Sequence, residues 1–597
     1  MTPDANNSAA VRVLMRDASS GRWLRFSRPR EIVRAVSLAE VMPALHQVED
    51  AARKGLYAAG FVSYEAAPAF DPALTVRDSG GFPRLWFGLY DGVEEEDLPT
   101  PAAGPGKADW QASVGFAEFE ANLSRIRELI RRGDTYQVNY TYRLEALLAA
   151  DPWEFFLRLV AAQEPPYGAF VDTGEWVIGS ASPELFFKLN GDRIVCRPMK
   201  GTAARGLTQA QDLAQADALR ASEKERAENV MIVDMVRHDL GRVAETGSVT
   251  VPQLFAVEKY PTVWQMTSTV EARIAADLGA TFRALFPPAS ITGAPKVRTM
   301  EIIAQLEPSP RRIYTGAIGF VAPGRRAQFN VAIRTLLLDR KTGRAEYSVG
   351  SGITWGSQPK AEWHECRAKA KILTAHAPSF SLLETMLWTA GEGYFLLARH
   401  LERLEQSALY FGFKVDLPAL RLELDRLAAR TTRTHQKVRV LVARVGCVTL
   451  EAEALPEPAA MPPRVALAPG PSDSSNPFIY HKTTNRGLYS DAQAACPSHH
   501  DVLLFNERGE LTESTIANLA VEINGKLCTP PIRCGVLPGT LRADLVERGE
   551  LFERAITIAE MRRSPRVVLL NSVRGMYQVQ IDEAPGNGPD RSTTAKQ

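Results

Sequence analysis

The chain has few cysteines and almost no net charge. Its 597 residues include six cysteines, and no two of them have the CxxC spacing of a zinc ribbon or redox motif. So few thiols in so long a chain are typical of a reducing cytoplasm, where we expect the protein to reside. Lys and Arg total 70 against 69 Asp and Glu. This balance gives no reason to expect a nucleic-acid or membrane-surface partner, so any anionic ligand must be held by local sites.

Long apolar runs are also missing. No segment approaches the roughly 18 apolar residues needed to span a bilayer, and residues 1–20 lack the apolar core of a signal peptide. The 45% hydrophobic and 23% charged fractions are typical of a soluble globular protein. The length predicts roughly three or four domains.

Stretches rich in Pro, Gly and Ala interrupt the chain. They occupy residues 98–107, 375–381 and 456–463, and the polar tail 583–597 is expected to be disordered. Between them, helical and strand patterns mix, so we predict an α+β fold for both halves. The patterns favour helices over Phe119–Arg132, Glu225–Leu240 and His400–Phe413, and strands over 177–181, 193–199, 317–322, 344–354 and 437–446.

Two pairs of glutamates have i, i+3 spacing: Glu225 with Glu228, and Glu362 with Glu365. On a helix each pair lies on one face. Two such faces opposed would make an oxygen-lined site for a hard cation such as Mg²⁺. From spacing alone, two solvated helix faces are the more common explanation.

Three further residues of the first half have chemical potential. Lys200, followed by Gly-Thr after a strand, is a nucleophile if desolvation lowers its pKa, and otherwise a surface lysine. Glu184, 16 residues earlier, is a candidate acid for a leaving hydroxyl. Arg334, at the end of an apolar strand, suits a substrate carboxylate.

The strings GDTYQVN, SPELF, PMKGT, AENVMIVDMVRHDLG, SITGAPK, YTGAIG, NVAIRT, GSGIT and EWHEC follow one another in order. This order resembles the chorismate-utilising family, which includes anthranilate, aminodeoxychorismate, isochorismate and salicylate synthases. The resemblance is specific over residues 115–375, the expected catalytic part of a domain spanning 1–375. It implies a β-sandwich core with surrounding helices.

The resemblance also implies a set of ligands. Mg²⁺ would be held mainly by Glu228 and Glu365, with Glu225 and Glu362 supporting through water. The carboxylates of chorismate would be bound by the metal and by a group of residues comprising Arg334, Tyr314, Gly350, Gly352 and Lys369.

Lys200 indicates the branch of the family. Relatives of the anthranilate type carry a small residue there, whereas the aminodeoxychorismate type carries lysine. The resemblance implies that Lys200 attacks C2 of chorismate as the C4 hydroxyl leaves, and that ammonia then enters at C4, with Glu184 as general acid and then base. Met199 and Gln265 depart from the family pattern, which usually has Ile and often His at these positions.

None of the six cysteines lies in the G-x-C-x-G context of a class I glutaminase. We therefore expect the chain to use free ammonia or ammonia from a separate glutamine amidotransferase subunit.

From about residue 380 the strings change to LLETMLW, RHLERLEQSALYFGF, YHKTTNR, GELTESTIANL, GVLPGTLR and LLNSVRGM. They resemble the fold-type IV pyridoxal-phosphate family, which contains branched-chain and D-amino-acid aminotransferases and aminodeoxychorismate lyase. The match over residues 380–582 implies two α/β subdomains and a homodimer.

This second resemblance implies a cofactor site for pyridoxal 5'-phosphate. Lys482 matches the lysine that carries the cofactor and acts as the base, and Glu513 matches the partner of the pyridine nitrogen. Arg403, Thr540 and Ser572 match phosphate contacts, and a helix N-terminus near Thr540 suits a phosphate. Taken singly, each has an ordinary surface or loop interpretation.

Together the halves predict a fusion enzyme that makes 4-amino-4-deoxychorismate from chorismate and then releases pyruvate to give 4-aminobenzoate for folate synthesis. The alternatives are a synthase fused to an amino-acid aminotransferase, an anthranilate-type synthase, which Lys200 disfavours, and a non-catalytic binder of chorismate.

Overall fold

The computed structural model describes residues 12–101, 108–373, 378–455 and 462–582. The expected disordered tail, 583–597, and parts of the three expected breaks lie outside them. The chain divides into two compact units. The first comprises Met1–Ala204 and Ala216–Ala377, and the second comprises Arg205–Gln215 and Pro378–Gln597. The second unit therefore includes a short segment that the sequence division assigned to the first half.

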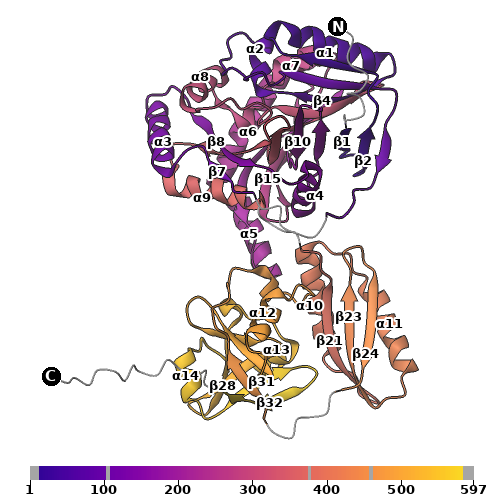
Figure 1. Cartoon of the computed structure of the whole chain (residues 1–597), viewed down its shortest axis with the longest axis vertical. Helices are drawn as coiled ribbons and strands as arrows, with labels where there is room; N and C mark the ends of the chain where they lie inside the picture. Colours follow the sequence, from indigo (N-terminus) through magenta and orange to yellow (C-terminus); the bar gives the residue numbers. More distant parts are fainter. Residues whose placement is uncertain (1–11, 102–107, 374–377, 456–461, 583–597) are drawn as a thin grey trace, which may run out of the picture. The chain divides into compact units, whose positions relative to one another are not determined.

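The first unit contains two antiparallel sheets whose strands differ in length (Figure 1). One sheet has the order β16 (Gly293–Ala294), β8 (Gln137–Leu147), β20 (Arg344–Ile353), β19 (Thr335–Asp339), β10 (Trp176–Ser180), β9 (Ala169–Asp172), β1 (Arg12–Arg16), β2 (Trp23–Phe26), β6 (Glu94–Glu96), with β7 (Gln111–Ala112) on β8. The other has the order β13 (Met199–Ala204), β15 (Val263–Arg273), β12 (Arg193–Arg197), β11 (Leu185–Asn190), β18 (Arg326–Val331), β17 (Ala317–Ala322), β4 (Tyr57–Val62), β5 (Leu85–Tyr90), β3 (Glu31–Ala35), with β14 (Thr250–Lys259) on β15.

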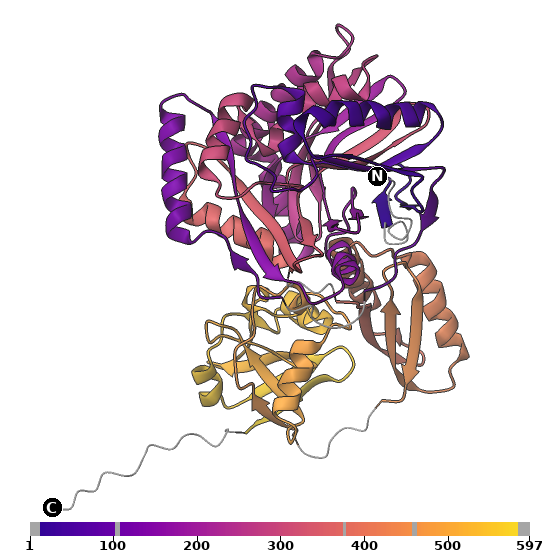
Figure 2. The ribbon, with the colours of Figure 1, turned by 45° about the horizontal axis from the view of Figure 1, so that its top comes forward.

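Helices cover the outer faces of these sheets. They are α1 (Leu38–Arg53), α2 (Ala67–Phe70), α3 (Phe116–Arg131), α4 (Pro152–Gln163), α6 (Glu223–Gly241), α7 (Leu278–Leu285), α8 (Lys296–Leu306) and α9 (Pro359–Ala370), and α5 (Gln209–Ala221) crosses from the second unit into the first. Helices α3 and α9 lie side by side (Figures 1 and 2), joined by the rings of Phe119 and Trp363 at 5.2 Å.

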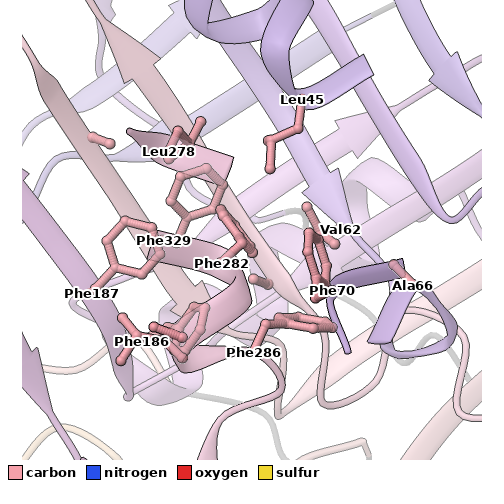
Figure 3. Packing of buried hydrophobic residues seen from close by; sticks show 14 of the residues in the cluster. Leu45, Val62, Ala66, Phe70, Phe186, Phe187, Leu278, Phe282, Phe286 and Phe329 are labelled. Atoms are coloured by element: carbon pink, nitrogen blue, oxygen red, sulfur yellow. The ribbon is translucent and has the colours of Figure 1, made fainter. Parts of the chain in front are cut away.

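Three apolar clusters hold these layers together. One lies between the sheets, with Val13 and Val171 from one sheet and Ala59 and Ile318 from the other. A second packs α1 and α7 on the outer face of the β13–β3 sheet, and a third packs α3, α4 and α8 on the other sheet. In Figure 3 the Phe282 ring lies among other phenylalanines, 5.2 Å from that of Phe329. The result is a β-sandwich with helices on both outer faces, which confirms the predicted fold class.

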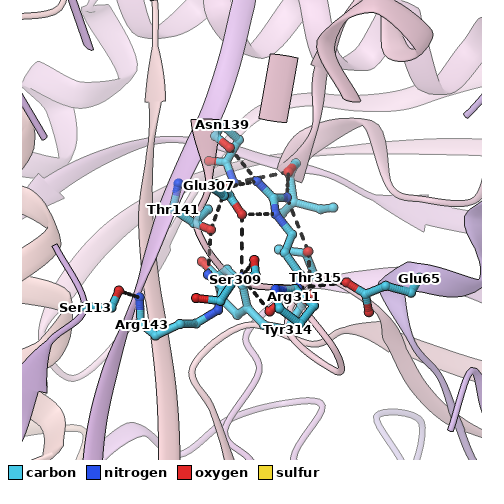
Figure 4. Close-up of polar contacts among 12 residues, drawn as sticks. Glu65, Ser113, Asn139, Thr141, Arg143, Glu307, Ser309, Arg311, Tyr314 and Thr315 are labelled. Atoms are coloured by element: carbon cyan, nitrogen blue, oxygen red, sulfur yellow. Dashed lines mark hydrogen bonds and ion pairs between the residues drawn. The ribbon is translucent and has the colours of Figure 1, made fainter. Parts of the chain in front are cut away.

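A buried polar network ties α8 to strand β8 (Figure 4). The Glu307 carboxylate accepts hydrogen bonds from the Arg311 guanidinium at 2.6 Å and from the Thr141 backbone N–H at 3.0 Å. Arg143 lies 3.5 Å from the same carboxylate. Thr141 faces Gly350 in the register of β8 with β20. The network therefore supports the strand pair that carries two predicted substrate-binding glycines.

Replacing Glu307 by Gln is expected to lower the free energy of unfolding by about 3–5 kcal/mol, because it leaves two buried arginines without their shared carboxylate. Urea denaturation of the full chain measures the change. Glu301→Gln is the matched control on the same helix, since it removes only a half-exposed ion pair with Arg298 and should cost less than about 1 kcal/mol. Equal losses in the two variants would contradict the role given to the network.

The second unit contains a four-stranded sheet and a larger mixed sheet. The first has the order β22 (Gly393–Tyr394), β21 (Leu382–Thr389), β23 (His435–Val442), β24 (Val448–Glu453). The second has the order β30 (Phe552–Glu553), β29 (Lys526–Thr529), β28 (Asn518–Ile523), β27 (Leu511–Ser514), β26 (Asp501–Phe505), β25 (Arg464–Leu467), β33 (Gln580–Ile581), with β31 (Val567–Asn571) on β28 and β32 (Gly575–Gln578) on β31. Its helices are α10 (Leu397–Phe411), α11 (Leu417–Arg430), α12 (Gly487–Ala495), α13 (Thr540–Glu547) and α14 (Ile558–Arg563).

Apolar periodicity explains why these elements form. Along β23 buried and half-buried residues alternate, and Val438, Val440 and Val442 are fully buried against α10 and α11. Each of the three predicted helices and five predicted strands corresponds to an observed element, with ends shifted by a few residues. In the described ranges, no helix combines the length and apolar character needed to cross a membrane.

Candidate active sites

Lys200 lies in strand β13 with its side chain inside the first unit. A β-carbon built on Gly352 would come within 2.2 Å of the Lys200 Nζ and 2.8 Å of the Gln137 Nε2, so the ends of these two side chains lie against the Gly352 backbone. Burial lowers the pKa of Lys200, opposed chiefly by the nearby Glu228. Burial therefore favours the neutral Lys200 amine, as the nucleophile hypothesis requires.

Several polar contacts hold the Lys200 strand in place. The Asn229 side chain, on α6, donates to the Lys200 carbonyl at 3.1 Å and accepts from the Ser268 hydroxyl at 2.6 Å. Gln265 donates to the Gly201 carbonyl at 2.8 Å and accepts from the Thr202 hydroxyl at 3.1 Å. Both ends of the Gln265 amide are thus used to fix the strand, which is a structural role for a residue that departs from the family pattern.

Glu184 is buried directly before strand β11. Its carboxylate accepts a hydrogen bond from the Ser290 hydroxyl at 2.5 Å. Burial raises the pKa of Glu184 to about 7, against the opposing effects of Ser290, the Met199 backbone and Lys200. A carboxyl group with such a pKa can both hold and release a proton near neutral pH, which suits a general acid that later acts as a base.

The two glutamate pairs lie on helices, as the spacing predicts. Helix α6 begins after Ser222, whose hydroxyl accepts from the Glu225 backbone N–H, and α9 begins with Pro359 at its first position. Burial raises the pKa of Glu228, and both Glu225 and Glu362 raise it further. Carboxylates from both helices therefore interact in one region.

Cations of the protein compensate these carboxylates. Lys369 lies 2.7 Å from Glu365, and Lys224 lies 3.6 Å and 3.8 Å from Glu225 and Glu228. Burial opposes the ionisation of Glu365, but Lys369 and other lysines outweigh it and lower its pKa. Among the described residues no three such side chains form a ready metal cluster. The oxygen donors and their mutual repulsion nevertheless suit a hard divalent cation.

The predicted carboxylate-binding residues fall into two groups. Lys369 donates to the Gly350 carbonyl at 2.9 Å, which joins it to strand β20 near Gly352 and Lys200. Tyr314 is buried and Arg334 is partly buried, and both affect the pKa of the buried Tyr347. Within the described ranges no hydrogen bond or ion pair joins Arg334 to Lys200. Burial lowers the pKa of Arg334, and its guanidinium is held by Gln163.

A cavity of about 390 Å³ lies in the second unit, within the range of small-ligand sites. The five predicted cofactor residues all line it: Lys482, Glu513, Arg403, Thr540 and Ser572. Burial, with help from Arg403, lowers the pKa of Lys482 to about 8. Its amine is therefore more readily deprotonated near neutral pH than an exposed lysine.

Glu513 is buried at one end of this cavity. Its carboxylate accepts hydrogen bonds from the Tyr489 hydroxyl at 2.7 Å, the Leu537 backbone N–H at 3.1 Å and the Asn518 amide at 3.2 Å. Burial raises the pKa of Glu513 to about 7. Tyr489 and Asn518 thus orient the acid that faces the cavity, which is a proper arrangement for a partner of a protonated pyridine nitrogen.

A second buried network contributes Arg403 and Thr540 to the lining of the cavity. The Arg403 guanidinium donates twice to Glu384, at 2.8 Å and 2.6 Å. Glu384 also lies 2.6 Å from His400 Nδ1, whose Nε2 lies 3.2 Å from the Thr540 hydroxyl at the start of α13. Despite burial, Arg403 and His400 hold the pKa of Glu384 at about 2. An arginine, a hydroxyl and a helix N-terminus converge here, as phosphate binding requires.

Sequence reasoning missed four of these residues. Gln137, Asn229, Glu384 and His400 all lie inside the quoted strings, but none carried a role. Gln137 lies beside Lys200, and its buried Oε1 has no hydrogen-bond partner in the part of the chain that the structure describes. Glu384 and His400 sit at positions 16 residues apart, and no local spacing signals that such residues meet.

Comparison with known proteins gives the family of each half. A model described as chorismate binding enzyme matches residues 18–375, and one described as amino-transferase class IV matches residues 381–581. The chain is 42% identical over 284 residues to aminodeoxychorismate synthase component 1 of Escherichia coli (47% of this chain, 61% of the relative). It is 41% identical over 285 residues to anthranilate synthase component 1 of Streptomyces coelicolor, which covers 46% of this chain and 55% of the relative.

The first unit also resembles a solved structure. Anthranilate synthase component I of Streptococcus pneumoniae matches with a TM-score of 0.52 and 25% identity, covering 59% of this chain and 92% of that one. The chain spans about three-fifths of the length of the curated relatives it matches first. Lys200 and the paired glutamates of the first unit lie within the first matched range, and the five predicted cofactor residues lie within the second. The chain belongs to the chorismate binding enzyme family, with a class IV aminotransferase domain following in the same chain.

Proposed function

We propose that the chain makes 4-aminobenzoate in two steps. The first unit converts chorismate and ammonia into 4-amino-4-deoxychorismate and water, and the second releases pyruvate from this product. The observation that carries the proposal is the presence in one chain of two partly buried lysines with lowered pKa values, Lys200 and Lys482, each in the matched range of its own family.

In the first step Lys200 and Glu184 divide the chemistry. The Lys200 amine attacks C2 of chorismate, and the C4 hydroxyl takes a proton from Glu184 and leaves as water. Ammonia then bonds to C4 and Lys200 is expelled, while Glu184 accepts a proton. The raised pKa of Glu184, about 7, supports both roles, since the group changes protonation near neutral pH.

The glutamates, through a bound cation, and the basic side chains would balance the negative charge of the substrate in this site. Magnesium, held by Glu228 and Glu365 with Glu225 and Glu362 in support, would supply positive charge against a dianionic substrate. Lys369, Arg334, Tyr314 and the backbone at Gly350 and Gly352 would bind the substrate carboxylates. Arg334 contacts Gln163 and forms no ion pair among the described residues. This supports the proposal, because a guanidinium without a carboxylate partner suits an anionic ligand.

In the second step Lys482 is the base. When bound, pyridoxal phosphate supplies an electron sink joined to the substrate amine. Lys482 removes the C4 proton, the bond from C3 to the ether oxygen breaks, and pyruvate leaves as the ring becomes aromatic. Glu513 holds a proton at the pyridine nitrogen, and Arg403, Thr540 and Ser572 bind the phosphate.

Two partners belong to the proposal. A separate glutaminase subunit supplies ammonia, in keeping with the component 1 names of the relatives. A second copy of the chain pairs through the second unit, as expected for fold-type IV enzymes, and the protein works in the cytoplasm.

Incubation of the purified chain with chorismate, ammonium, Mg²⁺ and pyridoxal phosphate tests the function. We expect 4-aminobenzoate and pyruvate in equal amounts, and a chelator should stop both by removing the metal. Accumulation of 4-amino-4-deoxychorismate without pyruvate would instead favour the aminotransferase alternative. Anthranilate as the product would contradict the assignment of the first unit.

A further inference from the structure

Residues 205–215 fold as part of the second unit, although they lie inside the range matched by the chorismate binding enzyme model, residues 18–375. This docking segment follows directly on strand β13, which carries Lys200, and includes the start of helix α5. Within the second unit it contacts Tyr410 on helix α10. The second unit is therefore completed by residues from the sequence of the first half.

A buried ion pair gives the docking segment its shape. Arg205 Nε lies 2.7 Å from Asp212 Oδ1, and the same oxygen accepts a hydrogen bond from the Gly206 backbone N–H at 2.9 Å. The two charged side chains are only 8% and 0% exposed. A β-carbon on Gly206 would come within 2.2 Å of the Asp212 backbone nitrogen, so this turn requires glycine. Because a buried charge is costly without its partner, Asp212 fixes both Arg205 and the backbone of the turn.

Tyr410 of helix α10 is held at two points by this segment. Its hydroxyl donates to the Gly206 carbonyl at 2.8 Å, and its own backbone carbonyl accepts from the Arg205 guanidinium at 3.0 Å. The guanidinium also lies 4.6 Å from the centre of the Tyr410 ring, which is within the range of a cation–π contact. These contacts together fix the orientation of the ring.

The Tyr410 ring in turn packs against His481. The two rings are stacked, with centroids 4.3 Å apart and planes at 28°, and the Phe411 ring meets His481 edge-on at 4.9 Å. His481 is buried, and its Nδ1 lies 3.0 Å from the Ser407 hydroxyl. Burial lowers the pKa of His481 to about 4, against the opposing effect of the Leu207 backbone in the docking segment. His481 is therefore a neutral, tightly packed ring at neutral pH.

His481 directly precedes Lys482 in the chain. The Lys482 backbone carbonyl accepts a hydrogen bond from the Leu383 N–H of strand β21 at 3.0 Å, while its side chain lines the cavity. The backbone here is therefore fixed at Lys482 by β21 and at the preceding residue by the packing of the His481 ring. A reacting group misplaced by about 1 Å can lose about a hundredfold in rate, even when the cause lies far from the chemistry.

We propose that Arg205 and Asp212 are positioning residues for Lys482, and that they act through Tyr410 and His481. This inference rests on the proposed function, which makes Lys482 the base for the C4 proton. None of these four residues is among those that line the cavity, so they direct the lysine and do not bind the substrate. Pyruvate release by the second unit thus depends on a segment that lies within the first half of the sequence.

Two aspartates of helix α5 provide a matched test in the full chain. Asp212→Asn keeps the shape of the side chain but removes the charge that fixes Arg205. With supplied 4-amino-4-deoxychorismate, its kcat for pyruvate release should fall about ten- to a hundredfold, while its KM stays close to that of the wild type. Asp217→Asn breaks only an exposed ion pair with Arg220 and should keep the wild-type kcat. Both variants should still form 4-amino-4-deoxychorismate from chorismate at the wild-type rate.

Tyr410→Phe separates the hydrogen bond from the packing of the rings. It removes the hydroxyl that reaches Gly206 but keeps a ring against His481. Its kcat for pyruvate release should fall in the same direction as that of Asp212→Asn but by less, because the Arg205 contacts to the backbone and ring remain. A larger loss than in Asp212→Asn would contradict a role that runs from the ion pair to the lysine.

The absorbance of the bound cofactor gives a second readout that needs no turnover. The pH at which this absorbance changes reports on the surroundings of Lys482, so Asp212→Asn should shift that midpoint and Asp217→Asn should not. An unshifted midpoint with wild-type kcat in Asp212→Asn would overturn the inference. A loss of cofactor binding or of both activities would also overturn it, because that result indicates a general structural role. A wild type that releases no pyruvate, but whose midpoint shifts in Asp212→Asn alone, would contradict the proposed function and leave the positioning role standing.

Discussion

Replacing Lys200 by Ala is expected to abolish the formation of 4-amino-4-deoxychorismate and to leave pyruvate release from the supplied intermediate unchanged. The buried amine is the only group to which we assign attack on C2 of chorismate. Its loss should lower kcat on the order of 10⁴-fold or more, the scale seen when a catalytic nucleophile is removed. Product analysis after incubation with chorismate, ammonium and Mg²⁺ measures the first activity.

Controls for this variant address packing and charge. Lys200→Met keeps most of the side-chain volume without the amine, so a loss equal to that of Lys200→Ala excludes a cavity effect. Lys188→Ala removes a lysine from strand β11 of the same sheet, where it is partly exposed, and should keep full activity. The proposed metal site and carboxylate contacts do not need the Lys200 amine, so they can persist in Lys200→Met, and only the attack on C2 is lost. Substantial turnover by this variant would therefore contradict the nucleophilic role.

Burial and Glu228 have opposite effects on the pKa of Lys200. Burial favours the neutral amine, which is the nucleophilic form, while Glu228 favours the charged form. Magnesium bound at Glu228 would cancel that opposition, so metal binding and activation of the lysine are coupled in the proposed site. Glu184 must hold its proton while Lys200 gives one up, and their environments push the two pKa values towards each other.

Much of this organisation was predictable from the sequence. The helix that carries Glu228 was predicted over Glu225–Leu240 and is observed as α6. The i, i+3 spacing of Glu362 and Glu365 fits the observed helix α9, but the sequence patterns did not predict that helix. The order of the motif strings then indicated both families. The strings did not reveal what supports each site, because support comes from residues distant in the chain. Ser290 reaches Glu184 across 106 positions, as only the fold can arrange.

The electrostatic state of the sites was also beyond the sequence. Glu184, Glu384 and Glu513 are all buried acids, yet their pKa values are about 7, 2 and 7. Glu384 differs because Arg403 and His400 face it, whereas the other two meet mainly neutral donors. A linear string contains the residue types but not these pairings. The acid for proton transfer and the acid that anchors an arginine are distinguished only by their neighbours.

Replacing Lys482 by Ala is expected to stop 4-aminobenzoate and pyruvate formation while 4-amino-4-deoxychorismate accumulates from chorismate. The variant lacks the proposed base for the C4 proton, and proton transfer by a positioned side chain contributes roughly 10²–10⁴-fold to rate. Burial has brought the pKa of this lysine to about 8, so a useful fraction of the wild-type amine is neutral near pH 7. Product ratios and the cofactor absorbance together measure the effect.

The contrast between the two lysine variants tests the division of labour within the chain. Lys482→Ala should leave the first unit active, whereas Lys200→Ala should leave the second active on supplied intermediate. A mixture of both variants should then restore 4-aminobenzoate, because each supplies the step that the other lacks. Lys526→Ala, which removes an exposed lysine packed over the Phe552 ring, is the control for the second unit. Continued pyruvate release by Lys482→Ala at the wild-type rate would contradict its role as the base, and an inactive mixture would contradict two independent sites that exchange a free intermediate.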